Sequence, residues 1–179
     1  MKQRLMRVTM VAALALGMSA LVAEPGGAVA HLQTCKKTTG SATLSPGLSP
    51  VVPSNNTIKA KGTLGGCTPA KATGGSGNLT ATIKVPGGSC AKLASGKQKL
   101  SGTAGTTWKN KKKSAYSLTF TTGSGATATV ATVTGRVTTG LFKGKKVSGQ
   151  IKFALKTGNC TTTPLTAITF TQTKPWIVG

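Results

Sequence analysis

Apolar and polar residues alternate with a period of two along much of the chain. In residues 79–85, Leu79, Ile83 and Val85 share one face and Thr80 and Thr82 share the other. Residues 58–64, 116–120, 147–155 and 168–170 repeat the pattern, with Gly-rich breaks between segments. Such alternation is typical of half-buried antiparallel strands whose wet face carries threonine. No segment beyond residue 30 shows the periodicity of a helix.

Short strands at close spacing with Gly-rich turns predict an all-β fold. We expect an antiparallel β-sandwich of short Thr/Gly-rich strands, with a β-barrel as the alternative. Residues 126–137 alternate poorly because Val130 and Val133 are out of phase. We therefore expect a β-bulge in that segment.

The first 30 residues predict a secretory signal peptide. Lys2, Arg4 and Arg7 precede an uncharged apolar run, and Ala28-Val29-Ala30 fits a cleavage site. Residues 31–179 then form a single disulfide-bonded domain that is secreted, extracellular or cell-wall associated, without a transmembrane span. A lipid anchor on Cys35 is disfavoured because Gln33 and Thr34 are poor residues for a lipoprotein signal.

Charge excludes most enzyme classes. The predicted signal peptide contains only three of the 23 Lys and Arg residues, but it contains Glu24, the single acidic residue of the chain. Its removal would leave no acidic side chain. General acid–base catalysis, glycoside hydrolysis and calcium or magnesium binding all depend on carboxylates. The chain's one histidine, His31, has no second histidine with which to hold copper, and a zinc site lacks C-x-x-C spacing. We expect a protein that is not an enzyme, with no metal and no cofactor.

One set of motifs mimics an acyl-transfer site. Ser89-Cys90-Ala91-Lys92 matches S-x-x-K, Ser76-Gly77-Asn78 matches S-x-N and Lys156-Thr157-Gly158 matches K-T-G. The order of the first two is reversed, the chain is short for that mixed α/β domain, and residues 86–88 lead into a loop instead of a helix. We therefore interpret these matches as chance.

The four cysteines predict two disulfides, as expected in an oxidising compartment. Pairing residues 36–44 with 58–66 so that Leu44 faces Ile58 also places Cys35 opposite Cys67. That register favours Cys35–Cys67 together with Cys90–Cys160. Pairing of Cys67 with Cys90 across residues 68–89 remains the alternative.

Several segments carry a family resemblance. They are residues 61–68, Trp108 before a Ser/Thr-rich strand, residues 135–144 with 147–149, and Asn159-Cys160 with Pro164-Leu165. In these the chain resembles uncharacterised secreted actinobacterial all-β proteins. The resemblance implies a fold and no activity, site or partner.

The lysines gather at two predicted turns. One turn follows Trp108 and the other follows Phe142; their lysines are Lys109, Lys111, Lys112, Lys113, Lys143, Lys145 and Lys146. A surface of one sign attracts polyanions over roughly 8 Å at physiological salt. We expect these lysines to bind anionic polymers, such as wall polymer, acidic glycan or lipid headgroups. Trp108 could stack on a base or sugar, although a position in the core of the sheet is the commoner role for a tryptophan.

Two other functions stay open. The domain could be a structural or protein-interaction domain whose charge is incidental, since lysines also keep strand edges from pairing with other chains. It could instead bind carbohydrate weakly through Trp108 or Trp176. A dedicated nucleic-acid ligand is not expected, because aromatic residues are few and no known binding module occurs. The sequence does not indicate an oligomeric state.

Overall fold

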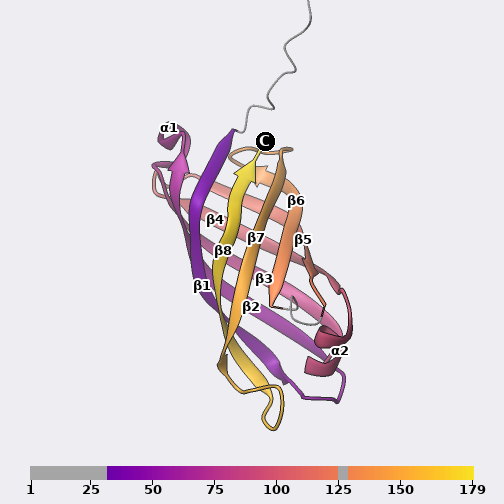
Figure 1. Ribbon diagram of the computed structural model, residues 1–179. Coiled ribbons are helices and arrows are strands. Elements are labelled where there is room, and N and C mark those ends of the chain that lie inside the picture. The colour runs from indigo at the N-terminus through magenta and orange to yellow at the C-terminus, as the bar shows by residue number, and fades with distance from the viewer. Residues whose placement is uncertain (1–31, 125–128) are drawn as a thin grey trace, which may run out of the picture.

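The computed structural model describes residues 32–124 and 129–179. Eight antiparallel strands form a closed barrel in which each strand pairs with its neighbours in sequence and β1 pairs with β8 (Figure 1). The strands are β1 Gln33–Leu48, β2 Ser54–Thr68, β3 Gly77–Gly88, β4 Lys99–Trp108, β5 Lys113–Thr122, β6 Val130–Gly140, β7 Lys146–Thr157 and β8 Leu165–Val178. The predicted signal peptide and His31 lie outside the described residues.

The predicted all-β class and antiparallel pairing are confirmed, but the sheet closes into the alternative architecture, a barrel, instead of forming a sandwich. Closure is carried by the ladder between β1 and β8, which runs from Gln33–Val178 to Leu48–Leu165. Because β1 and β8 pair along most of their length, neither is left as an edge strand. Period-two alternation occurs in both architectures and does not distinguish them.

Glycines on the inner face leave space for large side chains. Gly40 pairs with Gly62 across β1 and β2, and a Cβ on either would lie within 3 Å of the Phe170 ring. Only a residue without a side chain lets that ring lie against the barrel wall. The glycine-rich composition of the strands therefore serves packing as well as turns.

Two short helices lie in the connections and were not predicted. α1 (Ala70–Thr73) joins β2 to β3, and α2 (Cys90–Ser95) joins β3 to β4. Each is too short to show a periodic apolar stripe. Neither helix of the described part of the chain has the length or apolar character needed to cross a bilayer.

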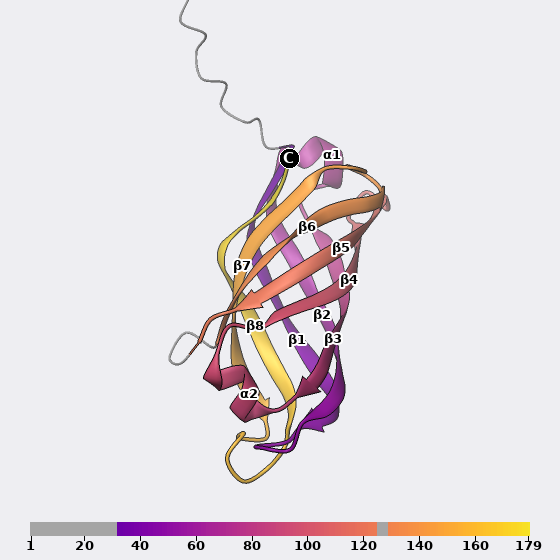
Figure 2. The same ribbon diagram turned by 90° about the vertical axis from the view of Figure 1, so that its right-hand side faces the viewer.

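The chain runs up and down, so its connections alternate between the two ends of the barrel. α1, the β4–β5 turn and the β6–β7 turn lie at the end where β8 finishes (Figures 1 and 2). α2 and the β1–β2 and β7–β8 connections lie at the opposite end, which we call the α2 end.

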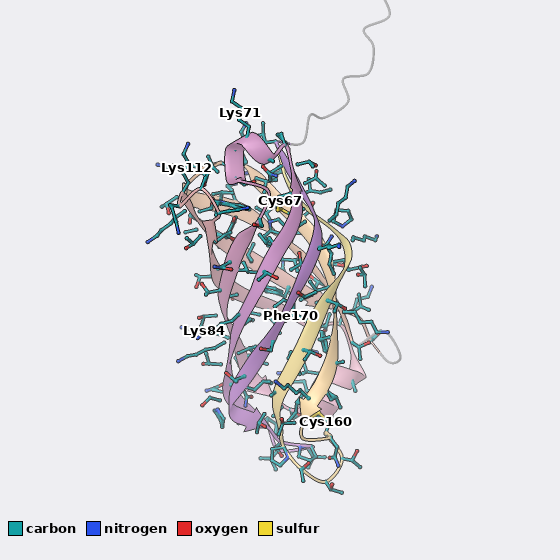
Figure 3. The ribbon with its side chains drawn as sticks, turned by 90° about the vertical axis from the view of Figure 1, so that its left-hand side faces the viewer. Cys67, Lys71, Lys84, Lys112, Cys160 and Phe170 are labelled. Atoms are coloured by element: carbon teal, nitrogen blue, oxygen red, sulfur yellow. A yellow bond between two sulfur atoms is a disulfide. The ribbon has the colours of Figure 1, made fainter. Side chains whose placement is uncertain are left out.

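Both favoured disulfides are confirmed. Cys35–Cys67 joins β1 to β2 in the predicted register, with Leu44 opposite Ile58. Cys90–Cys160 joins the start of α2 to the β7–β8 connection and lies in a small apolar cluster with Leu48 and Leu165. The first disulfide is part of a strand pair, whereas the second holds a helix across the end of the barrel (Figure 3 labels Cys67 and Cys160).

The predicted bulge lies elsewhere. The β5–β6 ladder is regular from Ala131 to Val137 and shifts at Thr138, one residue beyond the predicted segment. Val130 and Val133 are out of phase because Ala131, not Val130, is the buried residue at the start of β6. Residues 125–128 of that segment lie outside the described residues.

Candidate functional site: a cationic end of the barrel

The structure brings the two predicted lysine clusters to one end of the barrel. Residues 109–112 form the β4–β5 turn and residues 141–145 form the β6–β7 turn, and Lys71 of α1 lies at the same end (Figure 3 labels Lys71 and Lys112). We call this surface the cationic end. Its side chains, all exposed, are Lys71, Lys109, Lys111, Lys112, Lys113, Lys143, Lys145 and Lys146.

Hydrogen bonds tie the β2–β3 connection, which contains α1, to the β4–β5 turn. Lys109 N donates to Ser76 O at 2.9 Å, and Asn110 Nδ2 donates to Ala72 O at 2.7 Å. Asn110 also accepts from Lys112 N through Oδ1 at 3.2 Å, which shapes the turn itself. Hydrogen bonds thus join the segment that carries Lys71 to the turn that carries the lysines of residues 109–112.

The β6–β7 turn is joined to the same piece. Leu141 N donates to Lys113 O at 2.8 Å, and Ser114 Oγ donates to Leu141 O at 2.8 Å. Trp108 packs edge-on against Phe142, with ring centroids 6.2 Å apart. Three connections that are distant in sequence therefore present their ammonium groups from a shared, hydrogen-bonded platform.

Trp108 supports this platform from beneath and is not part of its surface. It is 1% exposed, and its Nε1 donates to Ser114 Oγ at 2.9 Å. Trp108 therefore has the core role, the commoner of the two alternatives, and no face of its ring reaches solvent to stack on a base or sugar. Trp176 is 4% exposed, so neither tryptophan offers the aromatic platform of a carbohydrate site.

Among residues 32–124 and 129–179, no carboxylate side chain is present to neutralise the cationic end. Glu24 is the only acidic residue of the sequence, and it precedes the residues that the structure describes. Arg136 donates through Nη1 to the Gly144 carbonyl at 2.7 Å, which adds a further cation beside the β6–β7 turn. Solvent and dissolved ions screen the field of these groups.

Lys111 occupies a backbone conformation that favours glycine. Its φ is 68°, in the left-handed region, and it lies in the β4–β5 turn. A residue with a side chain costs roughly 1–2 kcal/mol there. Non-glycine residues in this region concentrate at functional sites.

The remaining lysines are spread over the barrel. Lys59, Lys61 and Lys152 lie on the outer face of strands, and Lys92 and Lys97 lie near the α2 end. Among the large apolar residues that are exposed, Val51 and Val52 are neighbours in the β1–β2 connection, whereas Leu32 precedes β1 and Leu155 lies in β7. Only the lysines at the cationic end come together on connected turns.

The S-x-x-K motif requires a correction. Ser89 does precede a helix: it is the N-cap of α2 and its Oγ accepts from Lys92 N at 3.2 Å. The prediction that residues 86–88 lead into a loop instead of a helix is thus wrong. Ser89 is nevertheless 2% exposed, and Lys92 Nζ donates to Pro86 O at 3.4 Å instead of approaching the Ser89 hydroxyl. The local geometry gives Ser89 a capping role.

Within residues 32–124 and 129–179, no group of three or more His, Cys, Asp or Glu residues could hold a metal ion. One titrating group is perturbed by burial. Desolvation by burial raises the pKa of the Tyr116 phenol, and the nearby hydroxyl groups of Thr106 and Ser114 offset part of that effect. Tyr116 packs edge-on against Trp176 at 5.8 Å inside the barrel and contacts no surface.

Searches against family models, curated proteins and solved structures found no match for this chain.

Proposed function

We propose that this protein is a non-enzymatic β-domain that acts outside the cytoplasm and binds anionic polymers of the cell envelope through the cationic end. The observation that carries the proposal is the convergence of both lysine turns and α1 on a hydrogen-bonded platform. Two disulfides are compatible with an extracellular location.

Electrostatics favour a repetitive anion over a single small one. The ammonium groups are exposed on flexible side chains, so each contact is individually weak. A polymer that carries a charge on every repeat contacts several lysines at once and releases its condensed counterions. Affinity then depends on how many lysines lie within one Debye length of the polymer.

Retention on heparin and on isolated cell walls, measured across a salt gradient, tests the proposal. The test variant carries Lys→Gln at Lys109, Lys111, Lys112, Lys143, Lys145 and Lys146. A control with the same loss of charge carries Lys→Gln at Lys59, Lys61, Lys92, Lys97, Lys152 and Lys156. Both sets are exposed, so neither is expected to disturb folding.

The test variant should elute at much lower salt than the control. The slope of log affinity against log salt should also fall by more in the test variant, because that slope counts the contacts made. Equal losses in the two variants would show that net charge alone determines binding and that the cationic end has no special role. A nucleic-acid column run in parallel shows whether the polymer must be a glycan or wall polymer.

A further inference from the structure

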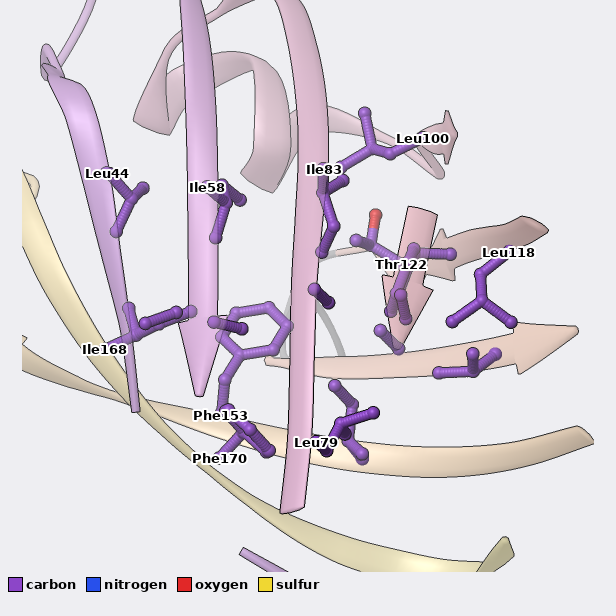
Figure 4. A pocket seen from close by; sticks show the side chains of 18 of the residues that line it. Leu44, Ile58, Leu79, Ile83, Leu100, Leu118, Thr122, Phe153, Ile168 and Phe170 are labelled. Atoms are coloured by element: carbon purple, nitrogen blue, oxygen red, sulfur yellow. The ribbon is translucent and has the colours of Figure 1, made fainter. Parts of the chain in front are cut away.

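An apolar cavity lies inside the barrel, towards the α2 end. Its volume is about 110 Å³, and side chains from all eight strands and α2 line it. Figure 4 shows its walls, among them Ile58, Ile83, Leu118 and Phe153. An engineered apolar cavity of about 150 Å³ stays dry and binds benzene. A cavity of the present size and composition suits a short alkyl chain or a ring.

Both ends of the barrel are closed over this cavity. At the cationic end, the buried rings of Trp108 and Tyr116 fill the interior. At the other end α2 lies across the opening, with Leu93 in the cavity wall and Cys90 N bonded to Ser49 O at 2.9 Å. Figure 2 shows α2 at this end of the barrel, and the Cys90–Cys160 disulfide links it to the β7–β8 connection. Entry along the barrel axis is therefore blocked.

The barrel wall is incomplete between β3 and β4. Their ladder ends at Ile83–Gly102, although β3 continues to Gly88 and β4 begins at Lys99. Pro86 lies in the unpaired stretch and has no N–H to donate. Within the sheet this is a lateral opening, with β3 still held by β2 and β4 still held by β5.

A surface groove of about 450 Å³ lies over this opening. Asn55, Lys84, Lys99 and Ser101 supply polar groups to the groove, and Leu100 lines both the groove and the inner cavity. Leu100 is half-buried, and in Figure 4 it lies beside Ile83 at the edge of the cavity. Leu100 thus lies between the apolar interior and a groove that two lysines help to line.

We propose that the barrel binds a small anionic amphiphile through this lateral opening. Its apolar end occupies the interior cavity and its single anionic head lies in the groove between Lys84 and Lys99. Ligand sites of this kind combine apolar walls with a few polar groups that fix orientation. Alkyl carboxylates and alkyl phosphates share this chemistry. The site is separate from the cationic end and does not depend on the proposed polymer binding.

Titration calorimetry with an alkyl series tests the proposal. Affinity should rise about fourfold per methylene from butyrate to octanoate, the free energy expected for each buried CH₂. It should level off in longer chains, because the cavity is closed at both ends. Octyl phosphate in place of octanoate distinguishes the two head groups, and 1-octanol measures the contribution of the tail alone.

Two pairs of lysines separate this site from the cationic end. Lys84→Gln with Lys99→Gln should weaken octanoate binding about fivefold, towards the affinity for 1-octanol, and leave 1-octanol unaffected. The matched pair Lys111→Gln with Lys112→Gln should change neither. Equal weakening by both pairs would overturn the proposal, because it would place the anion in the general field of the surface.

A cavity-filling variant tests the tail. Ala104 is buried and lines the cavity, so Ala104→Phe should abolish binding of octanoate and of 1-octanol. Methyl chemical shifts of the unmodified protein give the same answer without any variant. Octanoate should shift the methyl groups of Ile83, Leu100 and Leu118 and leave Val137 and Val147 unchanged. Absence of binding by octanoate and octyl phosphate, or shifts confined to the cationic end, would refute the proposal.

Discussion

Removal of the Cys90–Cys160 disulfide should destabilise the protein strongly and open one end of the barrel. The bond joins residues 70 positions apart, and Cys35–Cys67 joins residues 32 positions apart. The loss of chain entropy in the unfolded state corresponds to about 4.4 kcal/mol for the first and about 3.7 kcal/mol for the second. Removal of either disulfide should therefore lower the free energy of global unfolding, and the two decreases should differ by less than about 1 kcal/mol.

The two bonds differ in what they hold locally. Cys35 and Cys67 face each other within a ladder that continues to Ser45–Thr57, so strand pairing keeps that region together without the bond. α2 has two backbone hydrogen bonds to the β1–β2 connection, from Cys90 N to Ser49 O and from Ala91 N to Pro50 O. Without its disulfide, α2 should open while the strands stay paired.

The assay compares Cys90→Ala/Cys160→Ala with Cys35→Ala/Cys67→Ala. Urea unfolding gives the global free energy, and native-state hydrogen exchange gives local opening. The Leu93 amide, which donates to Ser89 O at 3.0 Å, should lose protection only in the first variant. A loss of stability below about 1 kcal/mol in that variant, or unchanged protection of α2, would refute the reasoning, because the disulfide would then not hold the helix.

Three further predictions concern single residues. Gly62→Ala should cost about 1–3 kcal/mol, because its Cβ would lie 2.5 Å from Thr39 O and 2.9 Å from Phe170 Cζ; thermal unfolding of Gly96→Ala, whose site is open, is the control. Lys111→Gly should raise the free energy of unfolding by about 1 kcal/mol, and the same gain from Lys112→Gly would contradict the role of the positive φ. Tyr116 is the only tyrosine, and burial raises its pKa in the folded state. The free energy of unfolding should therefore be unaffected below about pH 10, the pKa of an exposed tyrosine, and should fall as the pH rises above it. Tyrosinate absorbance should therefore appear only with alkaline unfolding; ionisation at the ordinary pKa in a folded protein would contradict this, and Tyr116→Phe is the control.

Local pairing was predictable because its signals are local. Leu44 opposite Ile58 also aligns Cys35 with Cys67, so one choice of register satisfied the alternation and the disulfide together. The position of the bulge was missed because a valine is apolar on either face of a sheet. Val130 is half-buried, and Ala131, a small residue with a weak pattern signal, occupies the buried position.

Closure of the sheet was not predictable in this way. It depends on pairing between residues more than 110 positions apart, such as Gln33 with Val178 and Leu48 with Leu165, which leaves no short-range pattern. The sequence left the role of Trp108 open between a core position and a surface one. A tryptophan beside four lysines is compatible with a surface site, and only the contacts of Trp108 with Ser114 and Phe142 show that it is buried.

The cationic end follows from topology combined with sequence. In an up-and-down barrel, every turn that follows an even-numbered strand lies at the same end, whatever its distance in sequence. The turn after β4 and the turn after β6 both carry lysines, and the connection after β2 adds Lys71. In a sandwich with crossing connections the same clusters could have lain at opposite ends. The barrel therefore turns two separate charge clusters into one surface, and the lateral opening beside Leu100 lies towards the other end of the molecule. Since the two sites share no residue, loss of polymer binding with retention of octanoate binding, and the reverse, are both expected in the corresponding variants.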